Sequence, residues 1–543
     1  MKTISKNILL GTLCVLPLFS ACNYEEINTN PFEMKESEGK MDGIADGGLV
    51  TSMQRSVFPI GTQADDTDVI NEYQISYHLS ADSWSGYFGQ NNDWNGGNNN
   101  TTYFLIDSWV SSTYRSSYTT PMNAWKSLKI QSEKNNTPDV YAMAQILRIS
   151  AVHKTLETFG PIPYSHAGEN KPNVPFDSER DVYTSIFKDL TDAIEVLTKM
   201  DDNGTTILMP ASDAVYGGNV GKWIRYANSL MLRLAIRVRY ADEEMAKKYA
   251  SQALNHPYGV ITSKEDEAKI SNGAGMVFRN NIQWLADQYN ESRMGSSMLS
   301  YLVGYDDPRT SKYFKETESW DAVMTSDGKR YQAVPPGHAY STNDEYQKFS
   351  KPNIESGTPT YWLRASEVYF LRAEAALVWG GEFGNPETLY REGIATSFAE
   401  NGVTSSVDEY MHSGATPIGH EVNSRYSYSA PAPTDATTEF SGSKEQKLEK
   451  IMIQKWIALY PNGQEAWTEW RRTGYPKLNK ILTLRGQAQG ATREGGIRRM
   501  IYPNSFYSTR ESKMIYDNAL KLLNNGAGGE DKSSTRLWWD RKN

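Results

Sequence analysis

An aromatic-rich loop is the first stretch of this sequence whose residue types suggest a chemistry. Between Ser80 and Asn100 the rings of Trp84, Tyr87 and Trp94 stand among Gly, Asn, Asp and Ser residues. Aromatic rings offer flat apolar faces, and Asn and Asp side chains form hydrogen bonds with hydroxyl groups. A sugar ring has an apolar C–H face and a rim of hydroxyls, so this combination predicts a carbohydrate-binding loop. The alternative is a long surface loop that two of its aromatic residues hold in place.

A second group of aromatic residues lies in the segment from Asn255 to Thr360. This segment interrupts the regular pattern of its surroundings with Gly, Ser, Asp and Pro, and its rings include Trp284, Tyr289 and Trp320. A bare loop of this length is uncommon inside a compact protein. The segment is therefore expected to contain small elements and part of a functional surface.

The sequence contains no recognised motif for metal-dependent, phosphate-binding or serine-nucleophile catalysis. Its seven histidines are scattered, and the turn Asp201–Gly204 begins like a calcium loop but lacks the glutamate that ends one. We therefore expect no catalytic residue, no metal and no cofactor. Carboxylates are abundant, however, and a pair of them that hydrolyses glycosidic bonds stays open as an alternative.

Charged residues give two further expectations. Arg364, Glu367, Arg372 and Glu374 lie on an otherwise apolar helical stretch, which predicts buried ion pairs between helices rather than catalytic groups. The formal net charge of −9 and the absence of a basic stripe with interleaved aromatics argue against a nucleic-acid partner.

Helical hairpins supply the frame that must position these loops. Between Lys222 and Leu254 apolar residues recur at three- and four-residue steps in two consecutive stretches, which predicts a pair of amphipathic helices. Similar pairs are predicted near 139–200, 361–400 and 443–523. Neither helix of a pair can bury its apolar face alone, so the four pairs predict a mainly α, tetratricopeptide-like stack.

The segments between the pairs lack this periodicity. We expect residues 41–543 to form a single domain in which 60–125, 255–360 and 401–441 make up a variable, ligand-binding lobe. Their content of Gly, Ser, Thr, Asp and Pro predicts long loops with few short strands.

The N-terminus has the pattern of a bacterial lipoprotein signal. Two lysines precede an apolar run, 8–19, that is too short to span a bilayer, and small residues stand before Cys22. We expect residues 1–21 to be removed, Cys22 to be lipidated and residues 22–40 to form a flexible tether; ordinary signal-peptidase cleavage is the alternative. The only other cysteine, Cys14, lies in the removed segment, so the mature chain has no disulfide.

Five stretches of the sequence together are characteristic in their order. They are the signal that ends at Cys22, FGPIPY at Phe159–Tyr164, KWIRYANSLMLRLAIR at Lys222–Arg237, YWLRASEVYFLRAEAALVWG at Tyr361–Gly380 and RRMIYPNSFYSTRES at Arg498–Ser512. In order and spacing they resemble the SusD/RagB-like family of Bacteroidetes outer-membrane lipoproteins over nearly the whole chain. Residues Glu465–Pro476 depart from the glycine-containing pattern that many members carry there, which suggests a divergent branch.

The resemblance implies a cell-surface protein of the outer membrane, built on four tetratricopeptide-like units. Such a protein captures oligosaccharides without catalysis and passes them to a SusC-like TonB-dependent transporter. The alternatives are a surface glycoside hydrolase and a purely structural scaffold lipoprotein that binds no sugar.

The family has no invariant sugar-binding motif that could be carried over to this chain. From loop position and the family's layout we expect the glycan to contact Trp84, Trp284 and Trp320, and after these Tyr87, Trp94 and Tyr289. A flat arc of rings suits an extended β-linked chain such as a β-glucan or xyloglucan, whereas a curved arc suits starch or fructan.

Overall fold

The computed structural model describes residues 44–542 except 62, 64, 170–173, 341–342 and 525. The predicted signal peptide, the lipidation site Cys22 and the tether lie outside the described residues. Gly47–Asn543 forms one compact unit, separate from Met1–Asp46. As predicted, the described chain is mainly α-helical with a few short strands. None of its helices is both long and apolar enough to cross a membrane.

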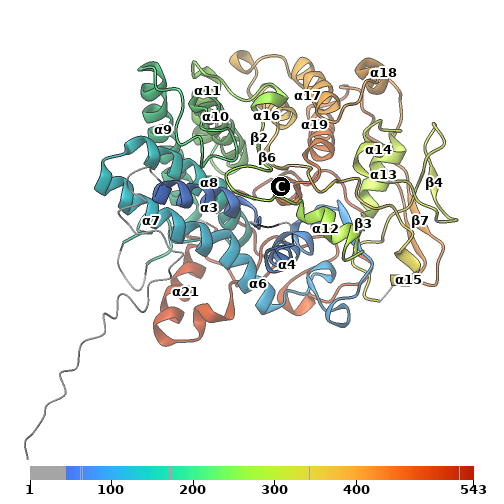
Figure 1. Cartoon of the computed structure of the whole chain (residues 1–543). Helices are drawn as coiled ribbons and strands as arrows, with labels where there is room; N and C mark the ends of the chain where they lie inside the picture. The colour runs from blue at the N-terminus through green and yellow to red at the C-terminus, as the bar shows by residue number, and fades with distance from the viewer. Residues whose placement is uncertain are drawn as a thin grey trace, which may run out of the picture. The chain divides into compact units, whose positions relative to one another are not determined.

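Two stacks of helices form the frame (Figure 1). In the first stack each helix contacts the next one along the chain: α7 (Thr120–Asn135), α8 (Pro138–Phe159), α9 (Glu179–Asp202), α10 (Val220–Arg237) and α11 (Glu243–Asn255). The second stack contains α16 (Ala365–Trp379), α17 (Pro386–Glu400), α19 (Lys444–Leu459) and α20 (Gly463–Thr473). Contacts between α10 and α16 join the two stacks. The pairs α8/α9, α10/α11, α16/α17 and α19/α20 correspond to the four predicted hairpins.

Helix α10 illustrates how the sequence builds this frame. The side chain of Asn219 accepts a hydrogen bond from the backbone N–H of Lys222 at 2.9 Å, which caps the first turn. Trp223, Leu230 and Leu234 in its apolar row are fully buried. The opposite face is covered as well, because α16 and β6 (Thr360–Leu363) pack against this helix. α10 is therefore a central helix with two buried faces.

Two parts of the frame differ from the sequence prediction. The assignment of residues up to 125 to the variable lobe is wrong, because α6 (Asp107–Tyr114), the π-helix η4 (Arg115–Thr119) and α7 lead into the first stack. Only a thin apolar row of α7 is buried, and the Ser- and Thr-rich stretch before it has low helix propensity, so the periodicity is weak. At the other end, α21 (Arg510–Leu522) packs on η8 (Asn504–Tyr507), so the fourth hairpin ends with α20.

The strands of the variable lobe form four two-stranded antiparallel sheets. They pair β1 (Phe88–Gln90) with β3 (Ser292–Met294), β2 (Ala268–Ile270) with β6, β4 (Val323–Met324) with β5 (Arg330–Tyr331), and β7 (His420–Val422) with β8 (Tyr428–Ala430). The first pair places Phe88 opposite Met294 and Gln90 opposite Ser292. It thereby joins the aromatic-rich loop to the insertion 255–360.

Short helices complete the described chain. Those before the first stack are α3 (Ile44–Val57), α4 (Thr67–Tyr73), η1 (Gln74–His78), α5 (Ala81–Trp84), η2 (Asn95–Gly97) and η3 (Asn100–Thr102). Those after it are η5 (Lys264–Asp266), α12 (Asn281–Asp287), α13 (Ser296–Gly304), α14 (Thr310–Tyr313), α15 (Asn343–Tyr346), η6 (Gly381–Phe383), α18 (Val407–Met411) and η7 (Gln487–Gln489). Among them α5 packs directly on α20.

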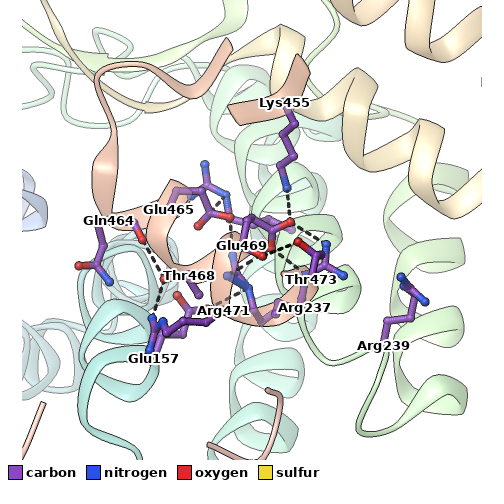
Figure 2. Close-up of polar contacts among 12 residues, drawn as sticks. Glu157, Arg237, Arg239, Lys455, Gln464, Glu465, Thr468, Glu469, Arg471 and Thr473 are labelled. Atoms are coloured by element: carbon purple, nitrogen blue, oxygen red, sulfur yellow. Dashed lines mark hydrogen bonds and ion pairs between the residues drawn. The ribbon is translucent and has the colours of Figure 1, made fainter. Parts of the chain in front are cut away.

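A network of buried ion pairs connects the two stacks. Arg233 on α10 donates two hydrogen bonds of 2.7 Å to Glu367 on α16, and Arg472 on α20 likewise donates to both oxygens of Glu374 at 2.7 Å. Figure 2 shows the adjoining part of the network, in which Arg237 contacts carboxylates of α8 and α20. The prediction that Glu367 and Glu374 form ion pairs between helices is confirmed.

Arg364 also forms buried ion pairs, whereas Arg372 forms none among the described residues. The Nε atom of Arg364 lies 3.2 Å from a carboxylate oxygen of Glu267 and 3.3 Å from one of Glu400. Arg372 is half-buried and its guanidinium lies over the ring of Tyr369, 5.4 Å from the centroid. Because Arg372 forms no ion pair among the described residues, the prediction for this residue is wrong.

Candidate functional site

The aromatic-rich loop buries two of the rings that the sequence predicts it to display. Trp84 is 5% exposed; its indole N–H donates to the backbone oxygen of Asn100 at 2.8 Å and its ring lies 4.9 Å from that of Trp467. Tyr87 is fully buried, and its hydroxyl donates to the backbone oxygen of Trp456. The expectation that these rings are displayed is therefore wrong, because α5 and β1 carry them into the core against α19 and α20.

The tip of this loop remains at the surface. Trp94 is half-buried, Asn95 and Asn98 are exposed, and the residues from Trp94 to Gly97 all have positive φ angles. The side-chain amide of Asn99 donates to the backbone oxygens of Asp93 at 2.9 Å and of Trp94 at 2.8 Å. These two bonds hold the tip in one conformation with its amides toward solvent.

The loop tip packs against the segment that contains Tyr340. A Cβ atom added to Gly97 would lie 2.7 Å from the Cβ of Ala339, so a side chain at position 97 has no room. Nearby, the buried ring of His338 contacts the backbone oxygens of Gln90 and Tyr340. The asparagine-rich tip and Tyr340 therefore lie on neighbouring segments of the same lobe.

Trp284 and Tyr289 form a separate pair on and after α12. Both rings are half-buried, and their centroids lie 6.3 Å apart in an edge-to-face arrangement. The guanidinium of Arg279 stands 4.7 Å from the centroid of the Trp284 ring, and the Tyr289 hydroxyl donates to Asn71 at 3.0 Å. Part of each ring is thus already occupied by protein groups.

Trp320 is the most exposed tryptophan side chain among the described hydrophobic residues, at 75%. Its neighbours fix the backbone there: Ser319 donates to Asp321 at 2.6 Å, and Asp321 accepts the backbone N–H of Asn423 at 2.9 Å. Burial raises the pKa of Asp321, but these hydrogen bonds outweigh it and the pKa lies below its ordinary value. The ring of Trp320 is therefore presented on an ordered loop that is tied to the hairpin β7–β8.

The same hairpin carries Tyr426, a residue that sequence reasoning missed. Its ring is stacked on that of Tyr340, with centroids 4.5 Å apart and an angle of 8° between the planes. Tyr340 is 46% exposed and Tyr426 is half-buried. A single aromatic residue within the polar run Asn423–Ser427 was the signal that could have identified it, as in the loop at Ser80–Asn100. We call Trp320 and the stacked pair of Tyr340 and Tyr426, which lie on segments linked through the hairpin β7–β8, the aromatic platform.

A large cleft lies beside β8, the second strand of this hairpin. Its volume is about 990 Å³, and its lining comes from α5, α13, the strand β8 and the chain after α20. The lining includes aromatic rings, hydroxyl groups, an amide, cations and one carboxylate. These residues are Ser83, Trp84, Tyr103, Ser297, Ser427, Tyr428, Trp470, Lys477, Asn479, Lys480, Arg493, Glu494 and Arg498. The cleft is of the size that binds a small molecule or part of a larger one.

One buried group has metal-ligating residue types. Ligand atoms of His153, Glu157 and Glu465 lie within 4.8 Å of one another. However, Arg237 contacts both carboxylates, with Nε 3.6 Å from Glu157, so its positive charge already stands between them. Burial and nearby Arg233 hold the pKa of His153 well below its ordinary value, and burial raises the pKa of Glu157 to about 7. We regard this group as part of the buried ion-pair network.

Comparisons with known proteins agree on one family. The sequence model of a family described as SusD-like, the SusD and RagB outer membrane lipoproteins, matches residues 26–540. Among solved structures, a chitin-binding SusD homologue from Flavobacterium johnsoniae is 32% identical with a TM-score of 0.83, covering 91% of this chain and 98% of that chain.

Other solved relatives come from Bacteroides. SusD homologues from Bacteroides vulgatus and Bacteroides uniformis are 29% and 31% identical, with TM-scores of 0.82 and 0.79. These matches cover 93% and 92% of this chain and 99% of each relative. A search of curated proteins found no match.

Proposed function

Because this chain belongs to the SusD-like family of outer membrane lipoproteins, we propose that it binds oligosaccharides at the cell surface without cleaving them. The bound glycan is handed to a SusC-like TonB-dependent transporter for import. Cys22 carries the lipid that attaches the protein to the outer membrane, and the tether lets the folded unit reach its partners.

The observation that carries this proposal is the aromatic platform. The exposed ring of Trp320 and the stacked pair of Tyr340 and Tyr426 offer apolar faces. Among the described residues the Trp320 side chain is neither buried in the core nor held by a hydrogen bond. The exposed amides of Asn95 and Asn98 supply hydrogen-bonding groups on a neighbouring segment. Stacking of sugar faces on such rings, with amides bonding the hydroxyls, is a binding chemistry and needs no catalyst.

The assignment of the other predicted aromatic residues follows from their exposure. We propose that Trp94, Trp284 and Tyr289 make secondary contacts, since part of each side chain remains accessible. Trp84 contributes one edge to the cleft. We propose no sugar contact for Tyr87, because no part of it reaches solvent.

Hydrolysis is less compatible with the described residues than binding is. A glycoside hydrolase needs two carboxyl groups about 5 to 10 Å apart on either side of the bond that breaks. Glu494 is the one carboxylate among the described residues that line the cleft, and it pairs with Lys480 at 2.6 Å. The buried carboxylates of the helical frame, such as Glu367 and Glu374, are held in ion pairs and cannot reach a polysaccharide.

For the glycan itself, the relative from Flavobacterium johnsoniae gives a starting point, since it is described as chitin-binding. Chitin is a β-linked chain, as are β-glucan and xyloglucan, and an extended chain of this kind matches separate, flat ring faces. We therefore propose a β-linked glycan. Starch and fructan serve as the contrasting class in the test.

The proposal is tested by calorimetric titration of the soluble protein beginning at Asn23 with chito-oligosaccharides, β-glucan, xyloglucan, starch and fructan fragments. We expect weak binding to a β-linked glycan, and we expect Trp320→Ala to reduce the affinity by about tenfold, since one stacked ring contributes roughly 1 to 2 kcal/mol. Because the Trp320 side chain is exposed, the melting temperature of the Trp320→Ala protein should equal that of the unsubstituted protein.

The matched control is Tyr507→Ala, an exposed aromatic residue beside α21 and remote in sequence from the platform. It should leave glycan affinity intact. Recovery of shortened glycan after incubation would contradict the non-catalytic proposal, and a complete lack of binding across the panel would favour the scaffold alternative. Co-purification of a TonB-dependent transporter with the lipidated protein tests the delivery step.

A further inference from the structure

The cleft beside β8 has an uneven distribution of charge. Four cations, Lys477, Lys480, Arg493 and Arg498, line it together with the single carboxylate of Glu494. The whole chain has a net charge of −9. A positive cleft in an acidic protein concentrates anions locally, since low-dielectric walls focus the field of the charges that line them.

Two of the four cations are neutralised by partners. The ammonium of Lys480 lies 2.6 Å from a carboxylate oxygen of Glu494. The Nε of Arg498 donates to Asp540 at 2.8 Å, and its second nitrogen contacts the other oxygen of the same carboxylate. Among the described residues, the unpaired positive charge of the cleft therefore comes from Lys477 and Arg493.

Lys477 and Arg493 form no ion pair among the described residues. The ammonium of Lys477 lies 4.7 Å from the centroid of the Tyr475 ring and is otherwise exposed. One terminal guanidinium nitrogen of Arg493 donates to the backbone oxygens of Ile481 and Leu482, which positions the side chain. Its other two nitrogens stay available. Both groups can therefore donate to a ligand in the cleft.

A second hollow continues the cleft and has the same sign of charge. It has a volume of about 230 Å³ and shares Gly474, Lys477 and Arg498 with the cleft. Arg471 lines it as well; this residue is 1% exposed, and its Nε has no acceptor among the described residues. A buried guanidinium nitrogen without an acceptor is costly unless an anion or water completes its hydrogen bonding.

The rest of the cleft suits a sugar. Trp470, Tyr103 and Tyr428 contribute ring edges or faces, and the exposed Ser427 and Ser429 contribute hydroxyls. Ser427 directly follows Tyr426 of the aromatic platform in the chain. The hairpin β7–β8 therefore contributes residues both to the platform and to the cleft.

We propose that the cleft binds an acidic segment of the glycan, with Lys477 and Arg493 contacting its carboxylate or sulfate groups. This inference rests on the proposed glycan binding but concerns a different surface from the platform. Both anionic groups present oxygen acceptors of similar geometry to ammonium and guanidinium donors. The substrate class is therefore an acidic polysaccharide or an acidic branch of one.

The test is calorimetric titration with chondroitin oligosaccharides, which carry carboxylates, and with their carboxyl-reduced neutral form at equal length. Sulfated chondroitin and its carboxyl-reduced form separate the sulfate from the carboxylate. We expect at least one charged probe to bind about tenfold more tightly than its neutral counterpart at low salt. High salt should abolish the difference, because exposed charges are screened.

Variants locate the effect. Lys477→Gln and Arg493→Gln should each remove most of the preference for the charged probe, and Lys477→Arg should retain it. Lys199→Gln is the matched control, since it removes the same charge from an exposed lysine on α9 that does not line the cleft, and it should change the preference little.

The inference is overturned if no charged probe binds better than its neutral form, or if Lys199→Gln has the same effect as Lys477→Gln, since net charge alone then explains binding. The two proposals remain distinguishable. Loss of neutral-glycan binding in Trp320→Ala with an intact charge preference tests the platform, whereas loss of the charge preference with intact neutral binding tests the cleft.

Discussion

At the scale of single residues, identical side-chain types serve opposite purposes in the variable lobe. Trp84 lies on α5 with its indole N–H bonded to a backbone oxygen and its ring against Trp467. Trp320 shows most of its surface to solvent. The first contributes apolar burial to the core, and the second is free to stack on a ligand. Substitution of Trp84 should therefore lower the stability of the protein, whereas substitution of Trp320 should weaken ligand binding.

We expect Trp84→Ala to lower the free energy of unfolding by about 3 to 5 kcal/mol, because it removes a buried ring and leaves a cavity. Denaturant unfolding followed by circular dichroism measures this loss. Trp320→Ala is the control and should change the unfolding free energy by less than about 0.5 kcal/mol. A Trp84→Ala protein of unaltered stability would contradict the placement of this ring in the core.

At the scale of the element, the hairpin β7–β8 connects the aromatic platform to the cleft. His420 on β7 fixes it: one ring nitrogen lies 2.7 Å from the hydroxyl oxygen of Ser296, and the other lies 2.8 Å from the amide oxygen of Gln332. A neutral ring satisfies both contacts by accepting from Ser296 and donating to Gln332. Burial lowers the pKa of His420 from 6.5 to about 4.

This lowered pKa makes the stability of the hairpin depend on pH. Between pH 4 and 6.5 the unfolded chain binds a proton at position 420 and the folded chain does not, so the free energy of unfolding falls as the pH falls through this window. The full shift corresponds to a loss on the order of 3 kcal/mol. His420→Gln should weaken this pH dependence, as measured by denaturant unfolding across the window.

The comparison has to be made between variants, because Glu157, whose pKa burial raises to about 7, contributes with the opposite sign. His412→Gln is the matched control: this histidine is exposed and contacts only a backbone oxygen of its own helical turn. An equal change in both variants would argue against the role of His420.

At the scale of the whole molecule, buried ion pairs hold the two helix stacks together. Glu374 on α16 pairs with Arg472 on α20 in its own stack and with Arg239, which follows α10 of the first stack. Burial alone raises the pKa of Glu374, but the two arginines outweigh it and the pKa lies below its ordinary value. The carboxylate is thus ionised in a fully buried position, and its loss leaves Arg239 without its carboxylate partner and Arg472 with Glu469 alone.

Removal of this one charge should therefore be costly. We expect Glu374→Gln to lower the free energy of unfolding by about 3 to 5 kcal/mol, the range for breaking a buried ion pair from one side. Asp517→Asn removes an exposed partner of Lys513 and should cost less than about 1 kcal/mol. Similar losses in both variants, measured by chemical denaturation, would contradict a structural role of burial at Glu374.

Attachment to the membrane is a property of the complete chain. Because several acyl chains at one cysteine anchor a protein stably, Cys22→Ala should move the protein from the membrane fraction to the soluble fraction or to an unprocessed precursor. Cys14→Ala is the matched control and should leave the fractionation unchanged, since Cys14 lies in the predicted signal peptide. Membrane association that persists in Cys22→Ala would contradict the lipoprotein assignment.

Local pattern was sufficient for the helical frame. The hairpins at α8/α9, α10/α11, α16/α17 and α19/α20 follow from apolar spacing and capping residues such as Asn219, because helix formation and one-sided burial depend on near neighbours in the chain. The weakly periodic helix α7 and the position of α21 did not follow, since their partners decide where they pack.

The candidate site depended on contacts between distant segments. Whether a loop tryptophan is buried is decided by what packs on it: Trp84 lies against Trp467, whereas Trp320 remains 75% exposed. Likewise Tyr340 and Tyr426 come from two different insertions, and the cleft combines α5, α13, β8 and the chain after α20. The sequence by itself determined a helical scaffold with aromatic-rich loops and predicted a membrane anchor. Only the tertiary structure decided which rings and cations are exposed, because exposure depends on packing between residues far apart in the chain.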